Sequence, residues 1–457
     1  MNIPRIVIAA SASGVGKTSV TVGLIEALRA RGLRVAPFKC GPDYLDPTYH
    51  ALATGCPSQN LDGWMMGREA VLTTFATAAR DADIAVIEGM MGLYDGATPT
   101  SEDGSTAQIA KWLGAPVLLV VDAAGIARTV AALALGFARF DPHLNLAGLI
   151  CNRVGGRGHL DLLRQSAPMV PIVGGLPDFP GGSFPERHLG LIRAASDDVS
   201  HARVAQWGPL VAQWCDLDRI LSLAGAASPL LSHPADEPAG ARSHCRLGVA
   251  FDEAFHFYYA DNLRRLEALG VEIVHFAPTA DHALPEVDGL YFGGGYPETQ
   301  AEALASNHAM LEAVRAFAAD GGPIYAECGG LMYLSAAIRT LDGKRWPMAG
   351  LFESDAVMHE RLQALGYVEV ETRAASMLGD AGQRFRGHQF RYSTLEPASK
   401  AECVYTVKPR WGGATFNEGY RSNNVLASYV HAHWASNPSL AARLADACVR
   451  FHKLAPR

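Results

Sequence analysis

The sequence lacks the features that mark secreted, membrane-spanning and zinc-binding proteins. Its eight cysteines include no pair spaced as C-x-x-C, so neither a disulfide framework nor a zinc site is indicated, and reduced thiols are expected. No apolar run reaches the roughly 18 residues that a membrane helix requires. The N-terminus has no basic start followed by an apolar stretch, as a signal peptide would. We therefore expect a cytoplasmic protein without a membrane partner.

Basic stretches are missing as well. The chain has 39 Lys and Arg against 46 Asp and Glu, which gives a formal net charge of −7. Because nucleic-acid-binding proteins usually carry a basic patch, no nucleic-acid partner is expected. Charged residues make up 19% and hydrophobic residues 49% of the chain, a balance typical of folded globular proteins. The length of 457 residues predicts two or three domains.

The first half of the chain alternates short apolar strands with helical patterns. This alternation predicts a parallel sheet covered by helices, in a domain that spans 1–190. The expected strands are 5–10, 33–38, 84–88, 117–121 and 146–151. Helices are expected at 18–31, 68–80 and 126–139.

A helical bridge and linker, 191–244, is expected to follow. Residues 196–223 have a helical pattern, and 225–243 are rich in Ala, Pro, Ser and Gly without a period. A second α/β domain is assigned to 245–440 and a C-terminal helix to 441–457. The expected strands of that domain are 247–251, 272–276, 289–292 and 323–326, with β-rich pieces at 366–371 and 427–430 and a helical pattern over 439–452.

A glycine-rich segment, SASGVGKT at 11–18, joins the first expected strand to the first helix. It fits the phosphate-loop pattern G-x-x-x-x-G-K-T except at Ser11. In such loops backbone N–H groups and the helix N-terminus hold phosphates, the lysine reaches the terminal phosphates and the threonine ligates magnesium. A turn that only leads into a helix is the alternative, and the Lys-Thr pair disfavours it. The residues predicted to bind ATP are Ser13, Gly14, Val15, Gly16, Lys17 and Thr18.

Polar residues after neighbouring strands complete the predicted nucleotide site. Glu88 ends an expected strand, and Asp43 and Asp46 lie in the Gly/Pro-containing loop after the second strand. The carboxyl ends of parallel strands share one edge, and Mg²⁺ prefers oxygen ligands. We therefore predict Thr18, Asp43 and Glu88 as magnesium ligands, although caps and turns also use acids. Asn152 follows another strand and is predicted to read the adenine edge, or to serve as a turn residue.

A cysteine nucleophile is predicted in the second half. Cys328 lies between an expected strand and a helix, in the manner of a nucleophile elbow, and the helix N-terminus is expected to lower its pKa. His431 is the predicted base, and His433 lies on the same face of its strand. Backbone N–H groups of Gly294, Gly295 and Gly329 are predicted to form an oxyanion hole. Each feature alone is usually structural, but their combination predicts a cysteine glutaminase that uses L-glutamine.

These segments together resemble the cobyrinate and hydrogenobyrinate a,c-diamide synthase family. The resemblance covers nearly the whole chain and rests on ASASGVGKTS, KCGPDYLDP, IEGMMGLYDG, FGGGYPE, AECGGLMYL and SYVHAHW. It implies a P-loop domain similar to dethiobiotin synthetase, fused to a class I glutaminase-like α/β domain. It also implies amidation of the a- and c-acetate carboxylates of a corrinoid polycarboxylate in cobalamin biosynthesis, through an acyl phosphate. Asp46 and Asp95 would lie near the substrate carboxylate and the γ-phosphate.

Two departures from the family pattern stand out. Class I glutaminases usually carry a carboxylate two residues after the catalytic histidine, and His433 occupies that place here. Gln389 and Arg391 stand where relatives often have Glu and His. Alternative readings are cobyrate synthase, nickel-sirohydrochlorin diamide synthase, or a partitioning-type ATPase with a degenerate glutaminase. The last is disfavoured by Ala12, where such ATPases carry a lysine. The sequence leaves open whether the ring contains cobalt and whether a homodimer forms.

Overall fold

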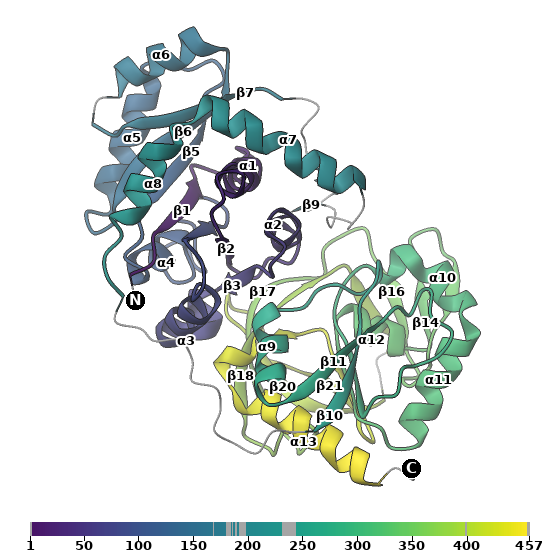
Figure 1. The fold of residues 1–457 in the computed structure, drawn as a ribbon. Helices are drawn as coiled ribbons and strands as arrows, with labels where there is room; N and C mark the ends of the chain where they lie inside the picture. The colour runs from purple at the N-terminus through teal and green to yellow at the C-terminus, as the bar shows by residue number, and fades with distance from the viewer. Residues whose placement is uncertain are drawn as a thin grey trace. The chain divides into compact units, whose positions relative to one another are not determined.

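The computed structural model describes residues 2–167, 169–179, 184, 186–187, 190–191, 198–230, 244–397 and 400–454. The chain divides into two compact units, Met1–Ala235 and Asp236–Arg457 (Figure 1). Among the described residues, no helix has both the length and the apolar character that a membrane span requires.

A seven-stranded parallel sheet forms the centre of the first unit, in the order β3-β2-β4-β1-β5-β6-β7. Its inner strands are buried along their whole length, as expected for apolar runs in a sheet covered on both faces. The strands are β1 (Arg5–Ala10), β2 (Val35–Cys40), β3 (Gln59–Leu61), β4 (Ile84–Glu88), β5 (Val117–Asp122), β6 (Leu146–Val154) and β7 (Ile172–Pro177), with a short pair, β8 (Glu186–Arg187) and β9 (Gly190–Leu191).

Helices connect the strands of this sheet. They are α1 (Lys17–Ala30), α2 (Asp46–Thr54), α3 (Gly63–Ala78), α4 (Thr106–Trp112), α5 (Thr129–Phe140), α6 (Arg157–Ser166), α7 (Asp198–Trp214) and α8 (Leu217–Gly225). Helices α3, α4 and α8 begin at a side-chain cap, such as the Asp62 side chain that accepts from the Met65 amide at 2.7 Å. Helix α1 has no side-chain cap and follows Gly16, whose backbone lies in the left-handed region. Its first N–H groups therefore face the phosphate loop without a side-chain acceptor.

Helices α7 and α8 cover part of the stretch that we expected to bridge the domains. Their apolar side chains belong to the core of the first unit, where Trp207 and Val211 pack with residues of α1. Two glycines allow this close approach. A Cβ on Gly23 would lie 2.5 Å from the Val211 side chain, and one on Gly208 would lie 2.8 Å from Glu26. Residues 231–243, the larger part of our linker candidate 225–243, lie outside the described residues.

The second unit is built on a ten-stranded mixed sheet, in the order β11-β10-β12-β13-β22-β21-β20-β17-β18-β23. The first five strands of this order are parallel and the others pair antiparallel. They are β10 (Cys245–Ala250), β11 (Val271–Phe276), β12 (Gly289–Phe292), β13 (Ile324–Glu327), β17 (Ala364–Thr372), β18 (Arg384–Arg391), β20 (Glu402–Pro409), β21 (Phe416–Ser422), β22 (Val425–Ser428) and β23 (His431–Ala432).

Helices and a smaller sheet complete the second unit, around two apolar clusters. The helices are α9 (Ala260–Ala268), η2 (Pro297–Gln300), α10 (Ala301–Ser306), α11 (His308–Ala319), α12 (Gly329–Leu334), η3 (Trp434–Ser436) and α13 (Ser439–Leu454). The smaller sheet has the order β15-β14-β16-β19 and consists of β14 (Ala337–Arg339), β15 (Arg345–Pro347), β16 (Asp355–Met358) and β19 (Ser393–Glu396).

Candidate active sites

The phosphate loop of the first unit lies between β1 and α1, as its sequence predicts. Gly14 (φ +78°) and Gly16 (φ +89°) both adopt left-handed backbone conformations, which a residue with a Cβ adopts only under strain. Arg153 donates to the carbonyl of Gly14 at 2.8 Å. The loop is thus shaped by its glycines and held from the end of β6.

Asn152 supports this loop directly. Its amide nitrogen donates to the Val15 carbonyl at 2.9 Å, and a Cβ on Gly16 would lie 2.2 Å from the same nitrogen. The side chain that we predicted to read adenine is therefore engaged, through its NH₂ group, with the phosphate loop. Gly16 is required for two reasons, its backbone conformation and the space that Asn152 fills.

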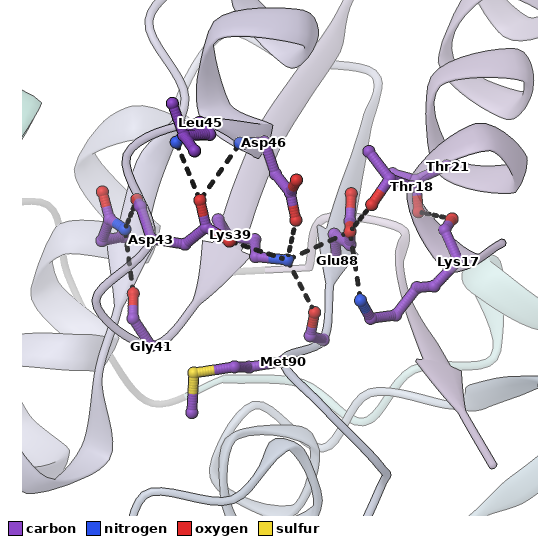
Figure 2. Close-up of polar contacts among 12 residues, drawn as sticks. Lys17, Thr18, Thr21, Lys39, Gly41, Asp43, Leu45, Asp46, Glu88 and Met90 are labelled. Carbon is purple, nitrogen blue, oxygen red and sulfur yellow. Dashed lines mark hydrogen bonds and ion pairs between the residues drawn. The ribbon is translucent and has the colours of Figure 1, made fainter. Parts of the chain in front are cut away.

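A buried cluster of lysines and carboxylates lies beside the loop (Figure 2). Thr18 Oγ1 donates to Glu88 Oε1 at 2.7 Å, and Lys17 Nζ lies 3.3 Å from the same oxygen. On the other side, Lys39 Nζ contacts Glu88 Oε1 and the Gly89 carbonyl, each at 3.0 Å, and forms a short contact with Asp46. Glu88 is thus the acceptor shared by both lysines and by the threonine of the loop.

The charges of this cluster shift the pKa values of its members. Burial alone would raise the pKa of Glu88, but Lys39, Lys17 and the hydrogen bond from His50 hold it well below its usual range. Burial would lower the pKa of Lys39, but Asp46, Glu88 and Asp43 raise it well above its usual value. Burial and the charge of Asp43 raise the pKa of Asp46 well above its usual value, against the effect of Lys39. Asp46 therefore takes a proton more readily than Glu88 does.

Two further predicted carboxylates have defined places. Asp43 lies 3.7 Å from Lys39 Nζ, and its Oδ1 accepts from the amides of Leu45 and Asp46, which shapes the start of α2. Asp95 accepts from the Gly92 amide at 2.9 Å and so closes the loop after β4. The Leu93 amide of this loop donates to the Ala10 carbonyl at 2.8 Å, which brings the loop to the start of the phosphate loop.

Two members of the cluster were absent from the predicted site. Lys39 is 1% exposed at the end of β2, and His50 on α2 is completely buried. His50 Nε2 lies 2.6 Å from Glu88 Oε2, and its Nδ1 lies 3.1 Å from Ser58 Oγ. A lysine in an otherwise apolar strand, VAPFKC, was the available signal for Lys39. For His50, only its position one helical turn after Asp46 pointed to the site.

The donor set fits a magnesium–nucleotide complex better than a metal cage made by the protein alone. In the part of the chain that the structure describes, no group of three or more His, Cys, Asp or Glu side chains is arranged to hold a metal ion. Mg²⁺ commonly takes one or two protein oxygens and completes its shell with water and phosphate. Thr18 Oγ1 and Glu88 Oε1, at 2.7 Å from each other, offer such a pair beside the phosphate loop.

The second unit holds Cys328 in a strained elbow. Cys328 follows β13, precedes α12 and has φ +48° and ψ −99°, a conformation unusual for a residue with a side chain. Its amide donates to the Ser428 carbonyl at 2.7 Å, and its Sγ lies 3.8 Å from the Phe390 carbonyl. Such an elbow places a nucleophile at the end of a strand, as the sequence predicts.

The predicted oxyanion-hole glycines lie together near His431. A Cβ on Gly294 would lie 2.4 Å from His431 Cε1, and one on Gly329 would lie 3.1 Å from the Gly295 nitrogen. The adjacent amides have other acceptors, because the Gly293 N–H donates to Tyr258 Oη and the Gly330 N–H donates to the Gly293 carbonyl. The structure therefore brings the three predicted glycines and the predicted base into one place.

The expected lowering of the cysteine pKa was wrong for this state of the protein. Burial raises the pKa of Cys328 to about 12, and the charge of Glu298 acts in the same direction, while Arg391 and the Gly329 amide oppose it. The N-terminus of the short helix α12 stabilises the thiolate less than burial destabilises it. Burial also lowers the pKa of His431 to about 3. A neutral thiol near a neutral imidazole needs proton transfer to become a thiolate.

The position that usually holds the third member of a glutaminase triad is buried. Burial lowers the pKa of His433 to about 4, and its ring centre lies 4.5 Å from that of Tyr259. Tyr259 Oη lies 2.9 Å from His388 Nδ1, and the ring of His388 stacks on that of His431 at 4.8 Å. His433 therefore does not replace the carboxylate but belongs to an aromatic cluster beside the base.

The two other departures from the family pattern, Gln389 and Arg391, both lie on β18. Gln389 is 4% exposed, and its amide nitrogen has no hydrogen-bond partner among the described residues. The Arg391 guanidinium stacks over the Tyr429 ring at 4.4 Å. Its positive charge opposes the rise in the pKa of Cys328.

Comparisons with known proteins agree with this two-site organisation. Residues 6–180 match the CobQ/CobB/MinD/ParA nucleotide binding domain, and residues 246–439 match the CobB/CobQ-like glutamine amidotransferase domain. A protein of Leptospira interrogans named cobyrinate a,c-diamide synthase is 50% identical over 98% of this chain and 99% of its own length. Proteins with the same name from Syntrophotalea carbinolica (47% identical, 98% and 99% covered) and Dehalococcoides mccartyi (42% identical, 96% and 97% covered) are also similar.

Both domain models and relatives that align over nearly the whole chain thus agree with the geometry of the two sites. The chain belongs to the cobyrinate a,c-diamide synthase family and combines a nucleotide-binding domain with a glutamine amidotransferase domain.

Proposed function

We propose that this enzyme amidates the a- and c-acetate carboxylates of a corrin ring, hydrogenobyrinate or cobyrinate, with ATP as activator and glutamine as nitrogen donor. The observation that carries the proposal is the full-length similarity to proteins named for this reaction, on a chain that holds both a phosphate loop and a cysteine elbow. The reaction belongs to cobalamin biosynthesis.

The first unit activates the substrate. A carboxylate is a poor acyl donor, and transfer of the γ-phosphoryl group of ATP converts it to an acyl phosphate with ADP as the other product. Lys17 and the open N-terminus of α1 bind the phosphates. Asp46 and Asp95 lie near the substrate carboxylate and the γ-phosphate. When ammonia attacks the acyl phosphate, the C–O bond to the phosphate breaks, phosphate leaves, and the nitrogen loses a proton to the solvent or to the departing phosphate.

Thr18, Glu88 and Asp43 are the residues that we propose as ligands for Mg²⁺. Of these, Thr18 Oγ1 and Glu88 Oε1 lie 2.7 Å apart, and Asp43 lies on the other side of Lys39, 3.7 Å from its Nζ. The metal, when bound, neutralises phosphate charge. Lys39 holds Glu88 and Asp46 in place.

The second unit produces ammonia. His431 takes the proton of Cys328, and the sulfur attacks the amide carbon of glutamine. N–H groups of Gly294, Gly295 and Gly329 stabilise the negative oxygen that develops. His431 returns the proton to the nitrogen, the C–N bond of this tetrahedral adduct breaks, and ammonia leaves a thioester behind. Water then hydrolyses the thioester, which releases glutamate and restores the thiol. We further propose that the enzyme acts in the cytoplasm, where ATP and glutamine are available, and that it assembles as a homodimer.

The ring substrate is tested by the mass of the product. Purified protein is incubated with ATP, magnesium, glutamine and either hydrogenobyrinic acid or cobyrinic acid. Two amide additions on one ring are expected, and the ring that reacts tells whether cobalt is present in the substrate. Glutamine hydrolysis without a mass change on either ring would contradict the corrin assignment.

Single substitutions distinguish the roles of the two sites. Cys328→Ala should abolish amidation with glutamine and leave amidation with ammonium salts within about twofold, because only the nitrogen supply is lost. Lys17→Ala should abolish both, since neither nitrogen source reacts with an unactivated carboxylate. Amidation rates with each nitrogen source are the measurement. Glutamine-dependent activity in Cys328→Ala would show that Cys328 is not the nucleophile.

A further inference from the structure

Glu327, the residue immediately before Cys328, has no role in the mechanism above. It ends β13, its side chain is 1% exposed, and three hydrogen bonds meet at its carboxyl group. Oε1 accepts from Tyr325 Oη at 2.8 Å and from the Ala432 amide at 3.0 Å, and Oε2 accepts from Tyr291 Oη at 2.9 Å. An acid is seldom buried in this way without a structural or functional reason.

The bond to Ala432 links the nucleophile to the base. Ala432 lies between His431 and His433 on β23, and β23 pairs with β18, not with β13. Within this sheet order, backbone pairing therefore does not fix β23 against β13. The Glu327 carboxyl group makes that connection one residue from Cys328 on one side and one residue from His431 on the other.

The tyrosines fix the carboxyl group itself. Tyr291 and Tyr325 are each 0–1% exposed, on the neighbouring strands β12 and β13. Their hydroxyl groups orient the two oxygens, so the direction of the bond to Ala432 is determined. A second buried acid, Glu418, accepts from Ser428 Oγ at 2.6 Å and from the Tyr429 amide, and holds the chain only at the start of the 428–434 segment.

We propose that Glu327 is a positioning residue of the glutaminase, which sets the place of His431 relative to Cys328 through the Ala432 amide. The proposal rests on the assignment of Cys328 and His431 as nucleophile and base. It requires a hydrogen-bond acceptor of the length of Glu at position 327, and it does not require a charge.

Three substitutions at position 327 distinguish the effect of side-chain length from the effect of charge. Glu327→Gln keeps an acceptor for Ala432 and offers an NH₂ group to Tyr291 Oη, so kcat for glutamine hydrolysis should stay within about threefold. Glu327→Asp keeps the charge but is one methylene too short to reach Ala432, and should lower kcat about 10²-fold with little change in KM. Glu327→Ala should behave like Glu327→Asp. Should Glu327→Ala not fold, the comparison of Asp with Gln carries the test alone.

The rate of Cys328 alkylation by iodoacetamide at neutral pH is a readout that a loss of stability alone does not lower. If His431 is misplaced in Glu327→Asp, this rate should fall about tenfold, because the thiol then lacks the base that takes its proton. Asp355→Ala is the matched control, since Asp355 is a buried acid of the same unit that binds Arg339 and Arg345. It should change neither kcat nor the alkylation rate.

Three results would overturn the proposal. They are an unchanged kcat in Glu327→Asp, a reduced kcat with an unchanged alkylation rate, and a loss of kcat in Glu327→Gln as large as that in Glu327→Asp. Failure of the underlying assignment is distinguishable, because Cys328→Ala would then retain glutamine hydrolysis whatever the Glu327 variants do.

Discussion

Gly16 carries two separate constraints, a left-handed backbone and the contact with Asn152. Gly16→Ala should raise the Kd for ATP more than tenfold, because the new methyl group overlaps the Asn152 amide and the strained backbone costs about 1 kcal/mol more. Gly55→Ala is the matched control, since Gly55 (φ +74°) has no atom within 4 Å of its virtual Cβ. Isothermal titration with ATP measures both. Equal affinities in the two variants would contradict the role of Asn152.

Glu327 also makes a prediction about stability and pH. Burial raises its pKa from the usual 4.5 to about 7, so between these values the folded state keeps a proton that the unfolded state has released. This group therefore destabilises the folded state as the pH rises, by about 3 kcal/mol above pH 7 at about 1.4 kcal/mol per pH unit. Glu327→Gln should be more stable than the natural chain at pH 8 and equally stable near pH 4.5.

Urea unfolding of the second unit at both pH values measures this difference. The buried histidines act in the opposite direction, because the pKa values of His431 and His433 fall to about 3 and about 4, and stability from them is lost as the pH falls below about 6.5. Their contribution is common to both chains and cancels in the comparison. A stability difference that does not depend on pH would contradict the ionisation of Glu327.

Local patterns predicted residues whose role is set by neighbours in the chain, such as Lys17 and Thr18 at the start of α1 or Cys328 at its elbow. They did not predict Lys39 or His50, because the importance of these side chains comes from Glu88, which is 49 and 38 positions away. The sign of the Cys328 pKa shift was wrong for the same reason. Burial depends on the whole core, whereas the helix N-terminus is visible in the local sequence.

At the level of elements, the strand positions were well predicted. The expected strands 5–10, 84–88 and 289–292 coincide with β1, β4 and β12, and most others differ by one or two residues at an end. Short apolar runs between turn residues are a strong signal for buried parallel strands. The packing of α7 on α1 was not predictable, because it depends on two glycines far apart in the sequence.

Helix packing gives a prediction at this scale. Gly136 in α5 has no atom near its virtual Cβ, so Gly136→Ala should stabilise the first unit by about 0.5–1 kcal/mol. Gly23→Ala gains the same helix propensity but places a methyl group 2.5 Å from Val211, and overpacking of this kind costs about 1–3 kcal/mol. It should therefore be destabilising. Chemical unfolding measures the stability of both variants. Stabilisation by Gly23→Ala would show that α7 shifts to accommodate the new methyl group without a loss of stability.

At the scale of the whole molecule, each unit has apolar clusters of its own. Two unfolding transitions are therefore expected in calorimetry. ATP with magnesium, at about 100 times its Kd, should stabilise the first unit by about 2.7 kcal/mol and shift only one transition. Lys17→Ala should remove that shift. A single transition that moves with ATP would mean that the two units unfold together.

The bond from Glu327 to residue 432 ends on the main chain. An alanine scan of the histidine-bearing segment would pass over this contact, because residue 432 is already alanine and every residue except proline keeps the backbone N–H there. Comparisons of related sequences would miss it at this position for the same reason. Replacing that single amide by an ester, through chemical synthesis or ligation, removes the N–H donor and keeps every side chain. The contribution of a main-chain hydrogen bond to glutaminase activity could then be measured directly.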